Sequence, residues 1–301
     1  MFIADIFGYL LNYLYDFFGN YGIAIIIFSI LLRIILLPIT ISQQKSMKKS
    51  AKLQGQIKAI QAKYKNNPEK LNQETMELYK REKMSPFSGC LSAILQIFII
   101  LSVFWLVSSP LTHMKNVQNL EIYNEYKKKV EENSSTKSSY KEIAMINLVE
   151  ADYKEIEEKL QNENIENRQE LEDKKNELEK LRINMDFFGL DLSKVPTQSL
   201  NDFRVYIIPI LYVISSFISI KLTTNAQNNK ESQDKQNNSE VDPMQGMTKS
   251  MNYMMPIMSV SIAAVAPLGL ALYWLMSNVL MILERIIIKK IIDSKEEKQN
   301  A

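Results

Sequence analysis

Residues that commonly carry catalysis or bind metals are scarce in this chain of 301 residues. It has one cysteine, Cys90, and one histidine, His113. A single thiol cannot form an internal disulfide, and a single imidazole cannot build a metal site of several histidines. The sequence also lacks the G-x-x-x-x-G-K-[ST] nucleotide loop, and no G-x-S-x-G motif surrounds its serines. We therefore expect that the protein is not an enzyme and that it holds no cofactor and no metal.

Charge is sparse in four long apolar runs, at residues 23–41, 91–108, 205–222 and 254–288. A membrane-spanning helix takes about 20 predominantly apolar residues, so each of the first three runs predicts one crossing. The fourth run is too long for one crossing, and Pro267-Leu268-Gly269 divides it into two. The sequence therefore predicts an all-α integral membrane protein with five transmembrane helices.

Residues 1–18 contain no Lys and no Arg, which argues against a cleavable signal peptide with a charged start. Their apolar residues recur at helical spacing, as in a helix that lies on a membrane surface. The predicted order is an extracellular-side interfacial helix (1–20), the first membrane helix (21–41), a cytoplasmic helical hairpin (42–88), the second membrane helix (89–109), an extracellular helical excursion (110–203), the third membrane helix (204–223), a disordered cytoplasmic loop (224–252), the fourth (253–266) and fifth (267–289) membrane helices, and a cytoplasmic tail (290–301).

The orientation in the membrane is predicted from the hairpin at 42–88, which holds eleven Lys and Arg residues against four Glu. Basic residues near the ends of membrane helices mark the cytoplasmic side. We therefore expect a multi-pass protein of the plasma membrane with its N-terminus outside and its C-terminus in the cytoplasm. The basic residues could serve only as this topology signal, or they could also contact lipid headgroups or a substrate.

The excursion at 110–203 has no Gly and no Pro between Pro110 and Gly189. Both residues interrupt helices, so their absence predicts long helical segments. We expect one helix near 114–132, a hinge at Ser134–Ser139 and a second helix over 140–183. The second helix is expected either to pack as in a coiled coil or to remain a solvated single helix, because its heptads are irregular.

Arg33 lies near the middle of the first apolar run. A guanidinium keeps its charge in proteins, and placing it at bilayer depth costs at least about 2.5–3.5 kcal/mol. Such a residue normally faces a bundle interior or a wet cavity, which makes Arg33 a candidate functional residue. The alternative is snorkelling to the headgroups. The eight residues between Arg33 and Ser42 span about 12 Å, more than an arginine stem covers, and we favour a buried, hydrated side chain.

Several short motifs follow one another along the predicted helices. They are Gly19-Asn20-Tyr21-Gly22 leading to Arg33 and Leu37-Pro38, Gln43 with Lys45-Ser46-Met47, Gln61-Ala62-Lys63-Tyr64-Lys65, Leu71-Asn72-Gln73-Glu74-Thr75-Met76, Gly89-Cys90-Leu91 with Gln96, and Leu272-Tyr273-Trp274 with Ser277-Asn278. In this order they resemble the YidC/Oxa/Alb family of membrane protein insertases, in the form typical of Gram-positive bacteria. The chain departs from the family at Ser92 and Ile97, where the family usually has proline, and in its long outer excursion.

The resemblance implies a hydrophilic groove between five helices, open to the cytoplasm and to lipid and closed on the outer side. Arg33 matches the groove arginine, and Gln96, Ser219, Trp274 and Asn278 are expected to line the same cavity. The implied function is to receive nascent membrane proteins in this groove and to assist their insertion and folding. The implied partners are nascent membrane proteins and membrane lipids, with the Sec translocon and the ribosome as further candidates. We expect a monomer and no specific nucleic acid.

The mechanism expected from these residues depends on a free cation. We expect Glu284 near the cytoplasmic interface, so that Arg33 has no fixed counter-ion and can receive acidic residues of another chain. Two alternatives remain: an anion-selective transporter or channel that uses Arg33, and a receptor or scaffold that binds a partner through its outer helix. The transporter predicts ion flux through a pore, whereas the scaffold predicts loss of function when the outer helix is deleted.

Overall fold

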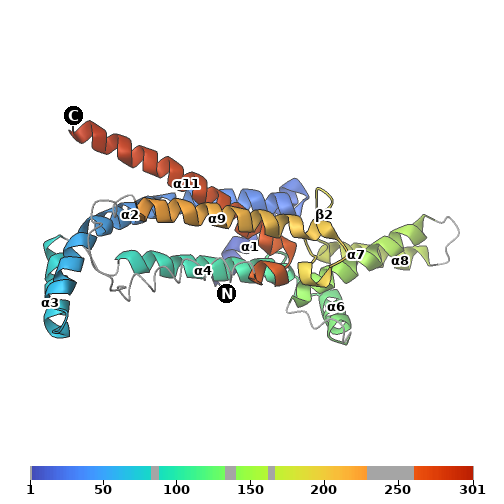
Figure 1. The fold of residues 1–301 in the computed structure, drawn as a ribbon. Helices are drawn as coiled ribbons and strands as arrows, with labels where there is room; N and C mark the ends of the chain where they lie inside the picture. The colour runs from blue at the N-terminus through green and yellow to red at the C-terminus, as the bar shows by residue number, and fades with distance from the viewer. Residues whose placement is uncertain (1, 83–87, 133–139, 162–166, 229–260, 301) are drawn as a thin grey trace.

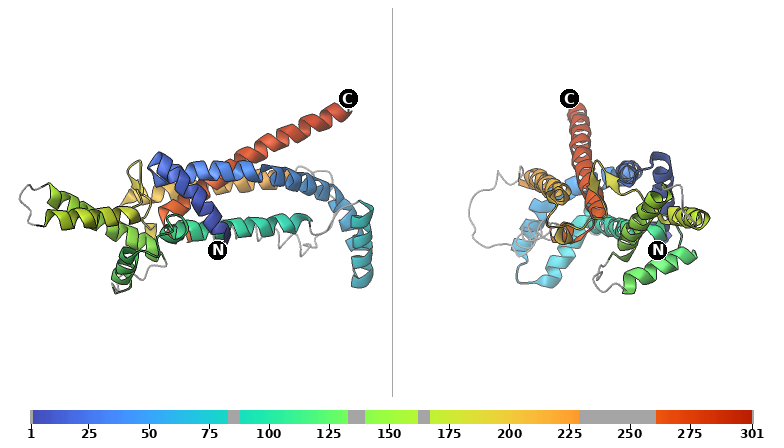
Figure 2. Two further views of the ribbon diagram at one scale, coloured as in Figure 1. Left: turned by 180° about the vertical axis from the view of Figure 1, so that it is seen from behind. Right: turned by 90° about the vertical axis from the view of Figure 1, so that its right-hand side faces the viewer.

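The computed structural model describes residues 2–82, 88–132, 140–161, 167–228 and 261–300. This part of the chain is mostly α-helical and elongated (Figure 1). Long helices run through the middle of the molecule, a helical hairpin lies at one end, and three shorter helices lie at the other end (Figures 1 and 2). The polar parts of the chain are thus separated by a central layer of long helices.

Three helices among the described residues are long and apolar enough to cross a membrane. They are Tyr21–Ser46, Phe203–Leu222 and Leu268–Ile288, and they lie in α2, in η2 with α9, and in α11. A shorter apolar stretch, Ile94–Ser108, lies in α4. Many large apolar side chains on these helices are exposed, including Ile34, Ile35, Phe98, Ile210, Phe217 and Ile287, as contact with lipid requires. The prediction of an all-α membrane protein is confirmed.

The number of five membrane helices stays a prediction. Most of the expected fourth helix (253–266) and of the expected loop (224–252) falls on residues 229–260, outside the described residues. Residues 261–265 are helical, and α9 (Ile207–Asn228) includes the first residues assigned to the loop. α11 (Leu268–Asn300) continues as one helix through the predicted tail.

α1 (Phe2–Phe18) precedes α2 (Tyr21–Lys63) and packs against it. Gly19 ends α1 with a φ of 64°, in the left-handed region that glycine adopts without strain. The Asn20 side chain then accepts a hydrogen bond of 3.1 Å from the backbone N–H of Ile23 and caps α2. The Gly-Asn pair therefore sets where the Arg33 helix begins.

The hairpin consists of the last part of α2 and of α3 (Pro68–Arg81). α2 is 43 residues long and is not interrupted at Pro38, so the first membrane segment and the first arm of the hairpin are one helix. Asn67 caps α3 by accepting a hydrogen bond from the backbone N–H of Lys70, and Pro68 occupies the first turn, where its missing N–H costs nothing. The hairpin has its own small core of Leu53, Ile57 and Leu78.

The end of the molecule opposite the hairpin, here called the outer end after its predicted location, contains α6 (Glu121–Glu132), α7 (Lys141–Leu160) and α8 (Arg168–Leu181) (Figure 1). The predicted single helix over 140–183 is wrong, because α7 ends at Leu160 and α8 folds back along it. Two ion pairs join α7 to α8, Glu157–Lys175 and Glu150–Arg182, each at 2.9 Å. Leucines at 178 and 181 are fully buried, so folding back hides an apolar face that a single solvated helix would expose. The predicted hinge lies at 134–139, outside the described residues.

A buried carboxylate attaches these outer helices to α4 (Ser88–Ser108). Glu142, at the start of α7, is 7% exposed. It accepts hydrogen bonds from the Thr112 backbone N–H at 3.0 Å, from the Tyr123 hydroxyl at 3.1 Å and from the Thr112 hydroxyl. Thr112 lies in α5 (Pro110–His113), which directly follows α4. Glu142 therefore joins three helices at one point.

Residues 183–195, here called the outer strap, are not helical, contrary to the prediction for 110–203. They contain a hairpin of β1 (Asp186–Phe187) and β2 (Leu190–Asp191). Its two-residue loop, Phe188-Gly189, has φ values of 52° and 77°, as in the tight turns that connect paired strands. Two 3-10 turns, η1 (Pro196–Gln198) and η2 (Phe203–Tyr206), then lead into α9.

The outer strap joins the starts of α2 and α11. The Tyr21 backbone N–H donates to the Asn184 carbonyl at 3.1 Å. The first N–H groups of α11, at Leu268 and Gly269, donate to the carbonyls of Lys194 and Leu192, both at 2.9 Å. Free N–H groups at the start of a helix need acceptors, and the strap supplies them. It therefore connects the starts of the two helices that carry the candidate site.

Candidate functional site

Arg33 lies on α2 in the central layer and points towards α11. Its side chain is 16% exposed. Its Nη2 donates a hydrogen bond of 3.1 Å to the backbone carbonyl of Ser277. The guanidinium is thus held sideways between two membrane helices, whereas snorkelling requires it to extend along α2 towards the headgroups. A charged residue enclosed by apolar helices is costly, so its position calls for a function.

Glu284 contradicts the expectation that Arg33 has no counter-ion. Its carboxylate lies 3.6 Å from Arg33 Nη1, and its side chain is 7% exposed. The hypothesis of a free cation is therefore wrong. Ser277 and Glu284 are seven residues apart, so two helical turns bring both to the face of α11 that Arg33 contacts.

The Arg33–Glu284 pair is incomplete as an ion pair. A distance of 3.6 Å is beyond hydrogen-bond range, and neither carboxylate oxygen of Glu284 has a hydrogen-bond partner among the described residues. Leaving a buried acceptor unsatisfied costs at least about 1–3 kcal/mol. Charge attraction holds the pair together without the two parallel hydrogen bonds that an arginine and a carboxylate can form.

The space between Arg33 and the outer strap is filled by apolar residues. Tyr21, Phe28 and Tyr273 are 0%, 1% and 4% exposed. The rings of Phe28 and Tyr273 lie 6.5 Å apart, across α2 and α11. α11 packs closely on Tyr21 here, since a Cβ built at Gly269 would lie 3.4 Å from the Tyr21 ring, in ordinary contact. Packing therefore separates Arg33 from the outer strap.

Two further predicted site residues, Trp274 and Asn278, lie in the contact between α11 and α9. The Asn278 side-chain amide donates to the hydroxyls of Ser215 and Ser216 at 3.0 and 3.1 Å. The Trp274 ring lies 6.2 Å from the ring of Tyr212. Asn278 is buried, so its amide is used to hold two membrane helices together.

Ser219 and Gln96 differ in their surroundings. Ser219 is buried on α9, one turn beyond Ser215, and so belongs to the same polar seam between α9 and α11. Gln96 is exposed on α4. In the structure Arg33 contacts one face of α11. Trp274 and Asn278 lie on a neighbouring face of α11 and contact α9.

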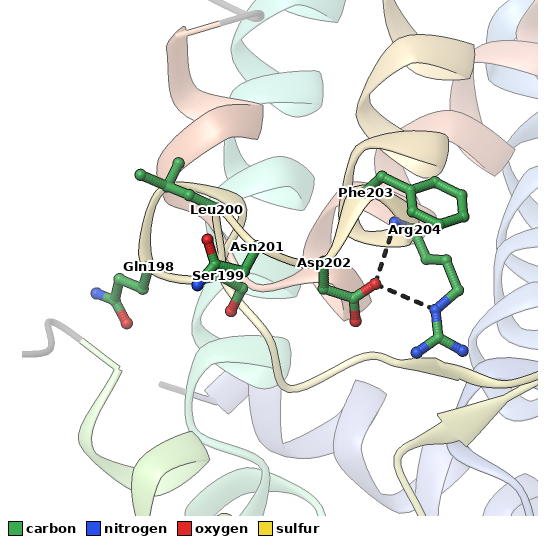
Figure 3. A pocket seen from close by; sticks show the side chains of 7 residues that line it. All are labelled: Gln198, Ser199, Leu200, Asn201, Asp202, Phe203 and Arg204. Carbon is green, nitrogen blue, oxygen red and sulfur yellow. Dashed lines mark hydrogen bonds and ion pairs between the residues drawn. The ribbon is translucent and has the colours of Figure 1, made fainter.

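A surface hollow lies away from Arg33, where residues 198–204 lead into α9 (Figure 3). Asp202 stands at its edge and accepts hydrogen bonds from the Lys194 ammonium at 3.0 Å and from the Arg204 side chain at 3.1 Å. These hydrogen bonds, Lys194 first, lower the pKa of Asp202 to about 2. Its carboxylate already accepts hydrogen bonds from Lys194 and Arg204, so the hollow is a structural feature where the chain turns into α9.

The comparisons with known proteins agree with this architecture. The chain is similar to the membrane protein insertase YidC of Caldanaerobacter subterraneus (43% identity over 102 residues, 34% of this chain and 50% of that protein) and of Fusobacterium nucleatum (45% over 102 residues, with the same shares). It is also similar to that of Cupriavidus necator (40% over 101 residues, 34% of this chain and 18% of that protein).

The matched region spans half or less of the length of these curated relatives. The model of the 60Kd inner membrane protein family, in contrast, matches residues 13–296. This match includes α2, α4, α9 and most of α11, and with them Arg33 and Glu284. Because it covers nearly the whole chain, this protein belongs to the 60Kd inner membrane protein family.

Proposed function

We propose that this protein is an insertase and chaperone that receives nascent membrane proteins and assists their insertion and folding in the bilayer. Its family and the printed names of its relatives support this proposal. The observation that carries it is the guanidinium of Arg33, which is 16% exposed between two membrane helices, α2 and α11. A cation at this depth attracts acidic groups of a substrate far more strongly than it would in water.

In this proposal five membrane helices enclose a hydrophilic groove that is open to the cytoplasm and to lipid. Arg33, Gln96, Ser219, Trp274 and Asn278 line it, and the outer strap with the aromatic packing beneath it closes the outer end. The polar outer tail of a substrate enters to meet Arg33, and its apolar segment moves out into lipid. Burial of that segment supplies the driving force, at about 25 cal/mol per Å².

The proposed setting is the plasma membrane, with the N-terminus outside and the C-terminus in the cytoplasm. The hairpin of α2 and α3 then faces the cytoplasm, where its Lys and Arg residues can contact lipid headgroups. We propose that the protein acts as a monomer and that the Sec translocon and the ribosome are partners. The names of the relatives, which are membrane protein insertases, do not support the anion transporter.

The test replaces Arg33 in protein reconstituted into liposomes and follows a nascent single-span protein with an acidic outer tail. Insertion is measured as the fraction of tail protected from external protease. We expect Arg33→Ala to slow insertion about tenfold, because a hydrogen bond to a charged group contributes about 1.5–3 kcal/mol. Arg33→Lys should be intermediate, since it keeps the charge and loses the planar fork.

The matched control is Arg168→Ala, which removes an exposed arginine on α8, and it should insert the substrate as the unmodified protein does. A photoreactive residue at position 96 should crosslink to stalled nascent chains if Gln96 lines the groove. Equal insertion of the acidic tail by Arg33→Ala and by the unmodified protein would refute the role of Arg33.

A further inference from the structure

We infer that Glu284 is a resident occupant of the Arg33 site, which an acidic side chain of the substrate must displace, and that it thereby sets how acidic a tail must be to be accepted. This inference rests on the proposed function. It adds a specificity-determining residue on α11 to the groove.

The geometry of the pair fits an occupant that can leave. Glu284 lies 3.6 Å from Arg33, and within the described residues neither of its carboxylate oxygens accepts a hydrogen bond. The one hydrogen bond found for Arg33 in this part of the chain goes to the carbonyl of Ser277. A guanidinium has five N–H donors, so an incoming carboxylate can gain hydrogen bonds that Glu284 does not make.

The same chain shows how an arginine–glutamate pair looks when it holds helices together. Arg182 Nε donates to Glu150 at 2.9 Å, and its Nη1 donates to Glu179, also at 2.9 Å. There burial raises the pKa of Glu150, but Arg182 and Lys154 together outweigh burial and leave that pKa below its ordinary value. The Arg33–Glu284 pair lacks these hydrogen bonds, so a purely structural role does not explain its geometry.

The position of Glu284 along α11 places it on the side of entry. Ser277 lies about 14 Å and Glu284 about 24 Å from the start of α11 at Leu268, by the rise of 1.5 Å per residue. The outer strap holds that start. Glu284 is therefore farther from the closed outer end than Ser277 is, and a chain that arrives from the hairpin side meets it first.

A displaced Glu284 keeps a cationic neighbour. The Arg285 cation follows Glu284 directly on α11, attracts its carboxylate and repels Arg33. In the exchange Arg33 loses the Glu284 carboxylate and gains a carboxylate of the substrate, while Glu284 stays next to Arg285. Neither Arg33 nor Glu284 is then left without an opposite charge in the apolar layer. A substrate tail without acidic residues offers no replacement, so Glu284 should not affect it.

The test uses Glu284→Gln in liposomes with two substrates that differ only in their outer tail, one with two acidic residues and one with their amides. We expect insertion of the acidic tail to rise roughly fivefold, because its competitor is gone, and insertion of the amide tail to stay unchanged. Glu284→Asp shortens the side chain by one methylene and moves the carboxylate away from Arg33, so insertion of the acidic tail should rise by an intermediate amount. Glu158→Gln neutralises an exposed carboxylate on α7 and should change neither substrate.

An unchanged or lowered rate for the acidic tail in both Glu284→Gln and Glu284→Asp would overturn the inference. If Glu284→Gln does not fold, Glu284→Asp decides alone. The failure of the proposed function is distinguishable, because it appears in Arg33→Ala: loss of insertion there with no response to Glu284 variants overturns the inference only.

Discussion

At the scale of single residues, this chain places carboxylates in two kinds of buried environment. Glu142 and Glu284 are each 7% exposed. Glu142 accepts three hydrogen bonds from two neighbouring segments, whereas Glu284 accepts none within the described residues and is held near Arg33 by charge. Hydrogen bonds to a buried charge fix its position, and charge attraction alone does not. Glu142 thus stabilises the fold, whereas Glu284 can leave Arg33 in the proposed exchange.

The first prediction at this scale concerns Glu142→Ala. It leaves the Tyr123 hydroxyl and the Thr112 N–H and hydroxyl without their acceptor, and we expect a loss of at least about 3 kcal/mol of local stability, since each of these three unsatisfied groups costs about 1–3 kcal/mol. Hydrogen exchange of α6 and α7 should accelerate accordingly. The control, Glu158→Ala, removes an exposed carboxylate and should leave exchange unchanged; equal exchange in both variants would show that Glu142 does not anchor the outer helices.

At the scale of elements, close approaches at glycine fix how the helices are arranged. A Cβ at Gly8 would lie 1.7 Å from the His113 carbonyl oxygen, so α1 and α5 touch through backbone. His113 also contacts Asp5 at 2.7 Å, and its hydrogen bond lowers the pKa of the Asp5 carboxyl. One turn of α1 therefore binds the segment that leads from α4 to the outer helices.

Gly8→Ala should accordingly be destabilising. The added methyl group forces α1 away from α5, and we expect a loss of about 1–3 kcal/mol, the usual cost of overpacking. Gly55→Ala makes the same chemical change on α2, where nothing lies within 4 Å of the new Cβ. It should stabilise the helix by about 0.5–1 kcal/mol. Thermal unfolding in detergent measures both, and a Gly8→Ala protein as stable as the unmodified one would contradict the close contact.

At the scale of the whole molecule, the outer end contains two parts with different tasks. The outer strap contacts α2 and α11 directly through Asn184, Leu192 and Lys194. α6, α7 and α8 pack mainly on one another and are joined to α4 through Glu142 and Thr112. The strap therefore belongs to the membrane part of the molecule, whereas the three helices form an addition to it.

Replacing residues 121–181 by a flexible Gly/Ser linker should test this division. The deletion keeps Asn184 and the whole strap, so we expect insertion of the acidic-tail substrate to persist at a rate within about threefold of the unmodified protein, since surface elements with few contacts tolerate change. The protease-protection assay measures it. Complete loss of insertion in a folded variant would instead favour a receptor or scaffold that acts through its outer helices.

Helix starts and membrane segments could be predicted because their signals are local. Asn20 and Asn67 cap α2 and α3, and apolar runs mark the membrane segments in α2, α9 and α11. The fold of the outer end could not be predicted in the same way. No Gly or Pro separates α7 from α8, and Phe188-Gly189 is not one of the usual turn pairs, so neither break carries one of the strongest local signals.

The sequence by itself determined that this chain is a helical membrane protein and that Arg33 lies within a membrane helix, because hydrophobicity and helix caps act over a few neighbouring residues. Only the tertiary structure decided what Arg33 faces. Glu284 follows it by about 250 positions in the chain and reaches it only because α2 and α11 pack side by side. The electrostatic environment of a buried charge is set by such long-range contacts, and no local pattern contains them.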